Sequence, residues 1–178
     1  YLDIKLQNVF NRGEELTLLW NRFDQERQEL NLKTHIPFLY NSPLSSRFEF
    51  SLYKQDSTFL NTAFKTDFSL FLGKSTQLAI NYDYIASKII TAALNTEAIT
   101  AFNSQFVGVS FQYKVPLKDV FSSQKAQLLF NPKIGQRTSN SQTENQLKIA
   151  LLASYIFEFN ERNSLSVANN SGYLNSAS

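Results

Sequence analysis

The sequence predicts an all-β fold, an antiparallel meander of about ten long strands. Two observations lead to this prediction. Apolar residues recur with a period of two along most of the chain, which is the spacing of a strand with one dry and one wet face. Turn-forming residues interrupt this alternation at hairpin spacing, so neighbouring strands are expected to pair without crossover helices.

Five strands are expected in the first half of the chain: Leu2–Phe10, Leu16–Trp20, Leu30–Ile36, Phe48–Leu52 and Phe64–Leu72. Polar and glycine-containing segments separate them. The third ends at Pro37, because proline has no N–H to donate to a central ladder. Residues 73–75, Gly-Lys-Ser, are expected to form a tight turn after the fifth.

Five more strands are expected in the second half: Leu78–Tyr84, Gln105–Val115, Ala126–Ile134, Leu147–Phe157 and Ser164–Asn170. The clearest is Gln105–Val115, in which Val107 and Val109 share one face while Gly108 and Ser110 share the other. Residues 87–104 are a looser stretch. Pro132 predicts a β-bulge or an irregular ladder within its strand.

The composition excludes several classes of protein. The chain has 178 residues, enough for one domain, with no cysteine and one histidine. These counts exclude disulfide frameworks, zinc–thiolate sites and multi-histidine metal centres. The net charge is +2 without a basic run, so nucleic acid is not an expected partner. The absence of methionine predicts that the chain begins inside a longer product or after processing.

Alternation does not say whether the dry face packs in a core or contacts lipid. The expected strands are long, which matches the roughly 9–11 residues needed to cross a tilted barrel wall. Short turns alternate with longer ones, and aromatic residues gather near strand ends, as in outer-membrane barrels. These aromatic residues are Phe10, Trp20, Phe23, Phe38, Tyr40, Tyr53, Phe59, Tyr82, Tyr84, Tyr113, Tyr155, Phe157 and Phe159.

We therefore expect the strands to be part of a transmembrane outer-membrane β-barrel. The mean hydropathy of −0.26 agrees with this, because the strands of such a barrel alternate apolar and polar residues. The residues expected to face lipid are Phe48, Phe50, Phe68, Leu70, Ile80, Val109, Phe111, Leu128, Ile149 and Leu151. The residues expected to face the lumen are Lys33, His35, Arg47, Glu49, Lys65, Asp67, Asp83, Gln112, Lys114 and Lys148.

Several segments carry a family resemblance in their order and spacing: residues 11–14, Asn-Arg-Gly-Glu, the Pro-aromatic segment 36–43, and the segments 54–59 and 169–176. By these segments the chain resembles the barrel domain of the BamA/TamA superfamily of outer-membrane assembly factors, also called the bacterial surface antigen family, and most closely its Bacteroidota-type members. The family's periplasmic POTRA domains and its Arg-Gly-Phe motif are not in the sequence. The resemblance therefore implies that residues 1–178 are one partial barrel domain, the N-terminal strands of a larger barrel.

The resemblance also implies a function in the bacterial outer membrane. Members of the superfamily assist the insertion, assembly or translocation of other proteins by strand addition at a lateral gate. The corresponding edge strand is Leu2, Asp3, Ile4, Lys5, Leu6, Gln7 and Asn8. The implied partners are outer-membrane lipid, unfolded outer-membrane protein clients, and periplasmic or lipoprotein accessory subunits.

Two other classes fit the alternation. A passive outer-membrane channel or another barrel would line its pore with the same wet face, and a soluble lipid- or ligand-binding β-barrel would turn the dry face inward. An enzyme is not expected. His35 has no second histidine to share a metal, Asp67 and Asp83 stand among lysine and asparagine, and no Gly-x-Ser-x-Gly elbow is present. No catalytic, cofactor or metal site is therefore predicted.

Overall fold

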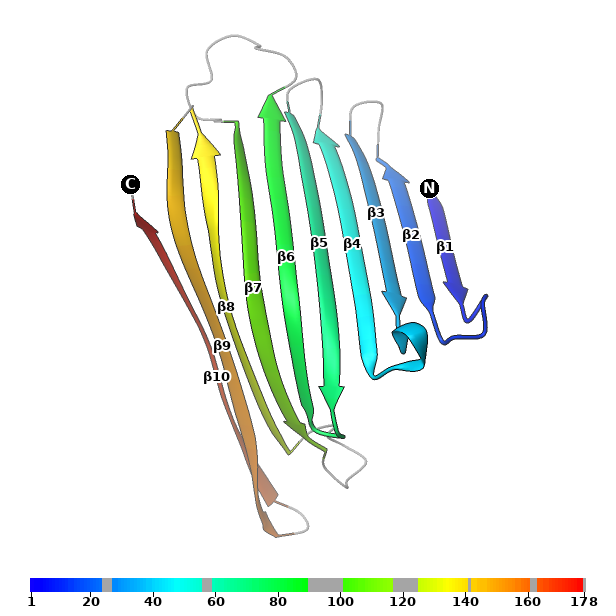
Figure 1. The fold of residues 1–178 in the computed structure, drawn as a ribbon, viewed down its shortest axis with the longest axis vertical. Coiled ribbons are helices and arrows are strands. Elements are labelled where there is room, and N and C mark those ends of the chain that lie inside the picture. The colour runs from blue at the N-terminus through cyan, green and yellow to red at the C-terminus, as the bar shows by residue number, and fades with distance from the viewer. Residues whose placement is uncertain are drawn as a thin grey trace.

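A computed structural model describes residues 1–23, 27–55, 59–89, 101–116, 125–140, 142–160 and 163–177. These residues form a single antiparallel sheet of ten strands, in which the order of the strands follows the sequence (Figure 1). Each strand pairs only with its neighbours in the chain. The prediction of an all-β meander of ten strands is confirmed.

The strands lengthen from six residues in β1 to 19 in β9, and most exceed the average of roughly 5–6 residues in soluble proteins. The elements are β1 (Leu2–Gln7), β2 (Glu15–Arg22), β3 (Arg27–Ile36), the short 3-10 helix η1 (Leu39–Asn41), β4 (Leu44–Gln55), β5 (Phe59–Leu72), β6 (Thr76–Ile89), β7 (Phe102–Val115), β8 (Ala126–Ser139), β9 (Gln142–Asn160) and β10 (Asn163–Ala177).

Most strand ends differ from the sequence prediction, generally because the strands are longer than expected, and two of these ends have a clear structural cause. β1 ends at Gln7, because Asn8 has a left-handed backbone with φ of 54° and its side-chain oxygen accepts a hydrogen bond from Gly13 N–H at 2.8 Å. Asn8 was predicted to belong to the edge strand, and that prediction is wrong. β10 was expected to stop at Asn170 but continues to Ala177, because its pairing with β9 continues to Asn145.

The sheet is open. β1 and β10 lie at its two opposite edges and are not paired with each other, so the described strands do not close into a barrel (Figure 1). Each edge strand uses its backbone groups toward one neighbour only, β1 toward β2 and β10 toward β9. The outer backbone groups of both edges are therefore free to pair with another strand.

The register continues across the sheet at Pro132. The ladder between β7 and β8 pairs Gly108 with Lys133 and Phe111 with Phe130, while the two intervening residues on each strand have no ladder partner. The register is the same on both sides of this gap, so Pro132 causes an irregular ladder and not a bulge. The missing N–H of proline explains the gap.

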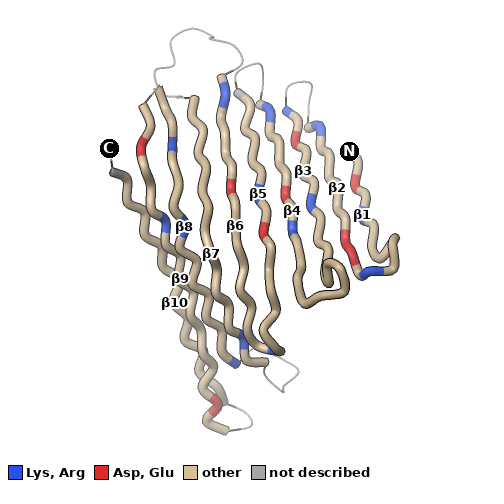
Figure 2. Tube along the Cα trace, viewed as in Figure 1, with Lys and Arg blue, Asp and Glu red and all other residues tan. Residues whose placement is uncertain are grey.

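The cross-strand register divides the strand residues into two faces. One, the apolar face, carries the two rows Leu70, Leu78, Phe111, Phe130, Leu151 and Phe68, Ile80, Val109, Ile149 with their neighbours along each strand. The other, the polar face, carries the rows Lys33, Glu49, Lys65, Asp83 and Arg47, Asp67, Asn81 with theirs. Figure 2 accordingly shows acidic and basic residues in the middle of several strands.

Burial is inverted relative to a water-soluble domain. Among the described residues the buried hydrophobic side chains are Ala86 and Phe106, whereas the buried polar ones are Ser45, Ser46, Ser69, Asn81, Ser87, Ser104 and Gln146. Large apolar side chains are exposed instead, with Ile80 at 61% and Ile134 at 68% of full exposure. Most of the buried polar residues lie on the polar face, as expected if the sheet curves toward that face and its side chains shield one another.

Candidate functional site

The ten residues that the sequence assigned to a lumen all lie on the polar face. Across neighbouring strands their charges alternate, because Lys33 faces Glu49, Glu49 faces Lys65 and Lys65 faces Asp83. In the next row Arg47 faces Asp67, and the Asn81 amide donates a hydrogen bond to the Asp67 carboxylate. Opposite charges on directly facing strand positions stabilise a sheet. The alternation of charge on the polar face therefore favours this register of the strands.

An ion pair and an aromatic ring occupy the middle of the polar face. The Lys133 ammonium lies 2.6 Å from a carboxylate oxygen of Asp83, with the two side chains 16% and 19% exposed. The Lys148 ammonium lies 3.6 Å from the centre of the Phe106 ring, and Phe106 is 1% exposed. This cation–π contact lets a buried phenylalanine sit among charged side chains.

The sequence did not single out Lys133 or Phe106. Alternation placed Lys133 on the wet face but gave no partner for it, since Asp83 lies two strands away. Phe106 is an apolar residue at a polar-face position of β7, where it faces Asp83. This break in the alternation is the feature of the sequence that could have drawn attention to it. Its ring lies against Gly135, the facing residue on β8. Glycine at that position leaves the space that the ring fills.

The ten residues that the sequence assigned to lipid all lie on the apolar face, and none of them is buried. Phe48 and Phe68 form an edge-to-face pair with ring centres 5.8 Å apart. The apolar face extends from Leu2 and Trp20 at one edge to Val167 and Tyr155 at the other, and in β10 it is interrupted by Asn169, Ser171 and Asn175. Large exposed apolar surfaces mark contacts with lipid or with other proteins.

Aromatic residues lie at both ends of the strands. Phe10, Phe38 and Phe159 are at the end that carries the β1–β2 and β9–β10 connections, and Trp20 and Phe23 are at the other. The expectation that Tyr82 and Tyr84 also mark a strand end is wrong. β6 extends to Ile89 and both tyrosines are in its interior.

One of the two free edges of the described sheet is β1, Leu2–Gln7, which pairs with β2 on one side and has no partner on the other. Ile4 and Leu6 lie on the apolar face, and Asp3 and Lys5 lie on the polar face. An incoming strand with the same alternation would continue both faces of the sheet. The chemistry available at this edge is backbone hydrogen bonding.

We also searched the described residues for side chains that could bind a metal ion. No group of three or more His, Asp or Glu side chains is arranged to hold a metal ion there. His35 stands on the polar face between Glu15 on β2 and Arg47 on β4. Within the same ranges, no helix is long and apolar enough to cross a membrane.

The β1–β2 connection is folded around the carboxylate of Glu14. The backbone N–H of Phe10 donates to one carboxylate oxygen, and that of Arg12 donates to the other at 3.0 Å. These bonds, first that from Phe10, lower the pKa of Glu14 below its ordinary value. The turn is thereby held by a charge that belongs to the turn itself.

We expect the Glu14 turn to loosen at low pH. Because the folded pKa is lowered, its stabilisation is present above the ordinary glutamate pKa and is lost as the pH falls through the lowered one. In Glu14→Ala, amide exchange at Phe10 and Arg12 should be faster than in the unmodified protein at pH 7, and the difference should shrink on acidification. Glu15→Ala is the matched control, since Glu15 makes no hydrogen bond to the turn. A difference that stays constant with pH would contradict this account.

Comparison of the chain with family models, with curated proteins and with solved structures found no match. Its function must therefore be inferred from three features: an exposed apolar face, a polar face with a paired charge pattern, and a free strand edge.

Proposed function

We propose that the ten-stranded sheet is part of the wall of a transmembrane β-barrel in the bacterial outer membrane, and that it assists the insertion, assembly or translocation of other proteins by strand addition at β1. The inverted burial carries the proposal. Serine, asparagine and glutamine side chains are buried, mostly on the polar face, while Ile80, Val109 and Phe68 are exposed on the apolar face. In water this arrangement is unfavourable, whereas in a bilayer the exposed apolar face contacts the acyl chains.

Strand length supports the same placement. β5, β6, β7 and β8 have 14 residues each, which is sufficient for the roughly 9–11 residues that a tilted strand needs to cross the hydrocarbon region. The aromatic residues at the two strand ends then lie at the two interfaces. The soluble ligand-binding barrel requires the apolar face on the inside of the curve, and the burial favours the opposite orientation.

The open edges argue for further strands. In lipid every backbone N–H and C=O needs a partner, so a sheet with two free edges does not persist there alone. Completion of the barrel by additional strands would satisfy both edges. We propose that the pairing at β1 is the weak point, because β1 has six residues whereas β10 has 15. A short seam has few hydrogen bonds to break when it opens.

In the proposed mechanism β1 separates from the closing strand and offers its free N–H and C=O groups to a strand of an unfolded client protein. The driving force is backbone pairing and apolar burial in lipid, with no ATP. The partners are outer-membrane lipid, the unfolded clients, and periplasmic or lipoprotein accessory subunits. The resemblance to the BamA/TamA superfamily is in agreement with this proposal.

Strand addition predicts a crosslink at one position and not at its neighbour. The chain has no cysteine, so a single introduced cysteine is specific within it. In the intact protein, Lys5→Cys on β1 should form a disulfide with a cysteine in the terminal strand of a client during its assembly. Thr17→Cys is the matched control, because Thr17 faces Lys5 in the register but lies one strand further from the edge. We expect at least about tenfold less crosslinking from it. Equal yields from the two positions, or none from Lys5→Cys, would overturn strand addition at β1.

A further inference from the structure

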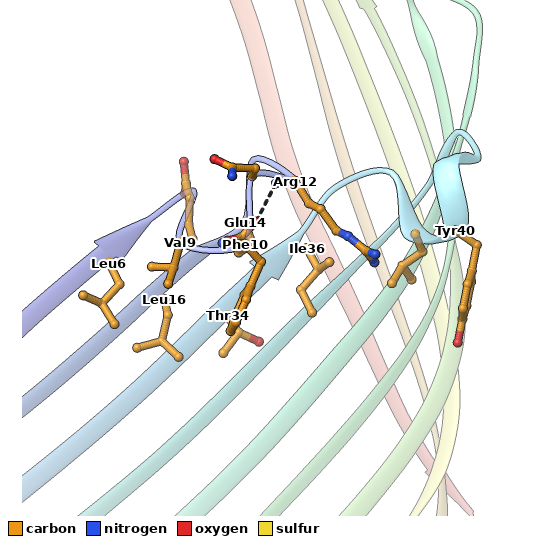
Figure 3. Close-up of a pocket in the computed structure, with 12 residues that line it drawn as sticks. Leu6, Val9, Phe10, Arg12, Glu14, Leu16, Thr34, Ile36 and Tyr40 are labelled. Carbon is orange, nitrogen blue, oxygen red and sulfur yellow. Dashed lines mark hydrogen bonds between the residues drawn. The ribbon is translucent and has the colours of Figure 1, made fainter.

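The two edges of the sheet differ in charge. At the β1 edge, an apolar groove of about 860 Å³ between the β1–β2 and β3–β4 turns is bordered by Arg12, Glu14 and Glu15 (Figure 3). Arg12 and Glu14 interact electrostatically, so the charges of this groove compensate one another. β10, at the other edge, has no charged residue between Asn163 and Ala177. A partner of β10 is therefore selected by hydrogen bonds and apolar contacts instead of charge.

In β10 the apolar face carries a stripe of polar side chains. This polar stripe consists of Asn169, Ser171 and Asn175, which are all exposed and whose partners on β9 are all apolar. In the proposed barrel a tilted strand crosses the hydrocarbon region with roughly 9–11 residues. Every stretch of that length within the 15 residues of β10 includes Asn169 and Ser171. No depth of insertion therefore takes the whole polar stripe out of the hydrocarbon region.

Lipid is an unfavourable neighbour for the polar stripe. An asparagine amide has two N–H donors and a carbonyl acceptor, and it loses their hydrogen bonds when it is transferred from water to hydrocarbon. The facing side chains of β9 are Ala153, Leu151 and Leu147, which offer no hydrogen bond. Within a bilayer, polar side chains of this kind are satisfied by hydrogen bonds to another protein surface. The polar stripe therefore indicates a protein contact at this edge.

A hollow of about 620 Å³ adjoins the polar stripe, with Asn175 in its lining. Gln136 and Asn145 contribute amide groups to it, and the Gln136 side chain donates a hydrogen bond to the Asn145 side-chain oxygen at 3.2 Å. Its apolar lining includes Val107, Ile134 and Leu147. The charged residues of β8 and β9 all lie on the opposite, polar face, so this hollow has an uncharged lining.

Tyr173 has the chemistry that such a hollow accepts. It lies on the same face between Ser171 and Asn175, is 56% exposed, and does not line the hollow of its own chain. A tyrosine ring packs against apolar side chains, and its hydroxyl both donates to and accepts from an amide. The β10 edge thus carries a projecting side chain and a hollow that are complementary to each other.

We propose that the polar stripe and the hollow form an interface with a second copy of this chain. A two-fold axis along the membrane normal inserts both copies in the same direction and brings each residue near its equivalent at the same depth. Asn169 then pairs with the partner's Asn169, since an amide is complementary to itself, and Tyr173 enters the hollow of the other copy. The lack of charge in β10 removes repulsion between the copies. This proposal rests on the proposed membrane placement.

Disulfide crosslinking between copies tests the interface. Ser171→Cys is introduced into the intact protein, native outer membranes are treated with a mild oxidant, and the disulfide-linked homodimer is quantified by non-reducing gel and mass spectrometry. Val109→Cys is the matched control, because Val109 is 56% exposed on the same face but lies in β7, three strands from β10. We expect at least about tenfold more homodimer from Ser171→Cys, since a formed interface raises the effective concentration of the paired thiols.

A second variant tests the role of the polar stripe. Asn169→Leu in the Ser171→Cys background should lower the homodimer yield by about fivefold or more, the effect of losing one net hydrogen bond. Assembly, measured by heat-modifiable gel mobility, should be unchanged, because leucine suits a lipid-facing position. Asn170→Leu is the control for this variant, since Asn170 is the next residue of β10 and lies on the polar face. It should leave the homodimer yield unchanged.

Three results would overturn the proposed interface: equal homodimer yields from Ser171→Cys and Val109→Cys, a disulfide from Ser171→Cys to a different protein, or equal effects of Asn169→Leu and Asn170→Leu. Carbonate extraction of the same membranes separates this failure from failure of the proposed function. A protein that resists extraction but gives no specific homodimer loses the interface and keeps the barrel. A protein that is extracted loses both.

Discussion

Lysine in place of Ile80 should lower the free energy of unfolding by about 2–4 kcal/mol in the membrane-assembled protein, the cost of a cation at the lipid face of a barrel near mid-wall. Ile80 suits this test because it is 61% exposed and lies in β6 between Phe68 and Val109. At so exposed a position in water, the same substitution would change the stability by about 0.5 kcal/mol or less. The two environments therefore predict different results for one variant.

Gln112→Lys introduces the same charge on the other face. Gln112 is half-buried on the polar face of β7, where it faces Gln77 and Leu129. If this face lines an aqueous lumen, the substitution should be tolerated to within about 0.5 kcal/mol. Stability would be measured by urea unfolding in lipid vesicles, and assembly by heat-modifiable gel mobility. Equal tolerance of Ile80→Lys and Gln112→Lys would show that the apolar face does not contact lipid.

The division into two faces could be predicted from the sequence because it depends on a local rule. Successive strand residues point to opposite sides, so the side of Ile80 or Gln112 follows from its neighbours in the chain. A shift of the register by one residue would have moved every side chain to the other face. The structure keeps most polar and apolar side chains apart from β3 to β8, whereas in β10 the apolar face also carries Asn169, Ser171 and Asn175. Alternation does not say which face meets water, and the burial of individual residues is the observation on which our proposal for it rests.

The ends of the strands could not be predicted in the same way. Asn8 continues the composition of β1, but its backbone turns because its side chain bonds the Gly13 N–H five residues later. β10 lacks clear alternation after Asn170, yet it remains a strand because β9 offers a continuous ladder. In both places a partner outside the strand itself decides the local conformation. Residues 90–100, which include most of the expected looser stretch, lie outside the described residues.

The candidate sites were predicted to different extents. The division of the strand residues into a polar and an apolar set follows from alternation, and the position of β1 at an edge follows from its place as the first strand of a meander. The groove does not, because Arg12, Leu16 and Tyr40 come together only when two turns pack against each other. Likewise Lys133 and Asp83 meet diagonally across β7. Spacing along the chain carries no signal for contacts of this kind.

Alanine in place of Gly135 should destabilise the seam between β7 and β8 by about 2–4 kcal/mol, the cost of overpacking a close contact. A β-carbon at this position would overlap the Gln105 carbonyl oxygen and lie 2.6 and 2.8 Å from Cδ1 and Cα of Phe106. The backbone conformation is not the reason, because positive φ among the described glycines occurs at Gly13 and Gly73. The substitution is restricted by the lack of space for a β-carbon between β7 and β8.

Gly172→Ala provides the matched control for Gly135→Ala. Gly172 lies on the same face in β10, and a β-carbon there would meet only the Ile149 carbonyl oxygen at 3.9 Å. That variant should be neutral or more stable by up to about 1 kcal/mol, since alanine loses less backbone entropy than glycine on folding. Urea unfolding of the intact protein in lipid vesicles would measure both.

A double variant identifies the atoms responsible. If the Phe106 ring were the main obstacle, Phe106→Ala would restore the stability lost in Gly135→Ala. The nearest obstacle is the backbone carbonyl of Gln105, so we expect no such rescue, and the double variant should be less stable than either single one because the Lys148 ammonium also loses its aromatic partner. If Gly135→Ala and Gly172→Ala were equally stable, the close approach of β7 and β8 would be wrong. The register that assigns the polar and apolar faces at this seam would be wrong with it.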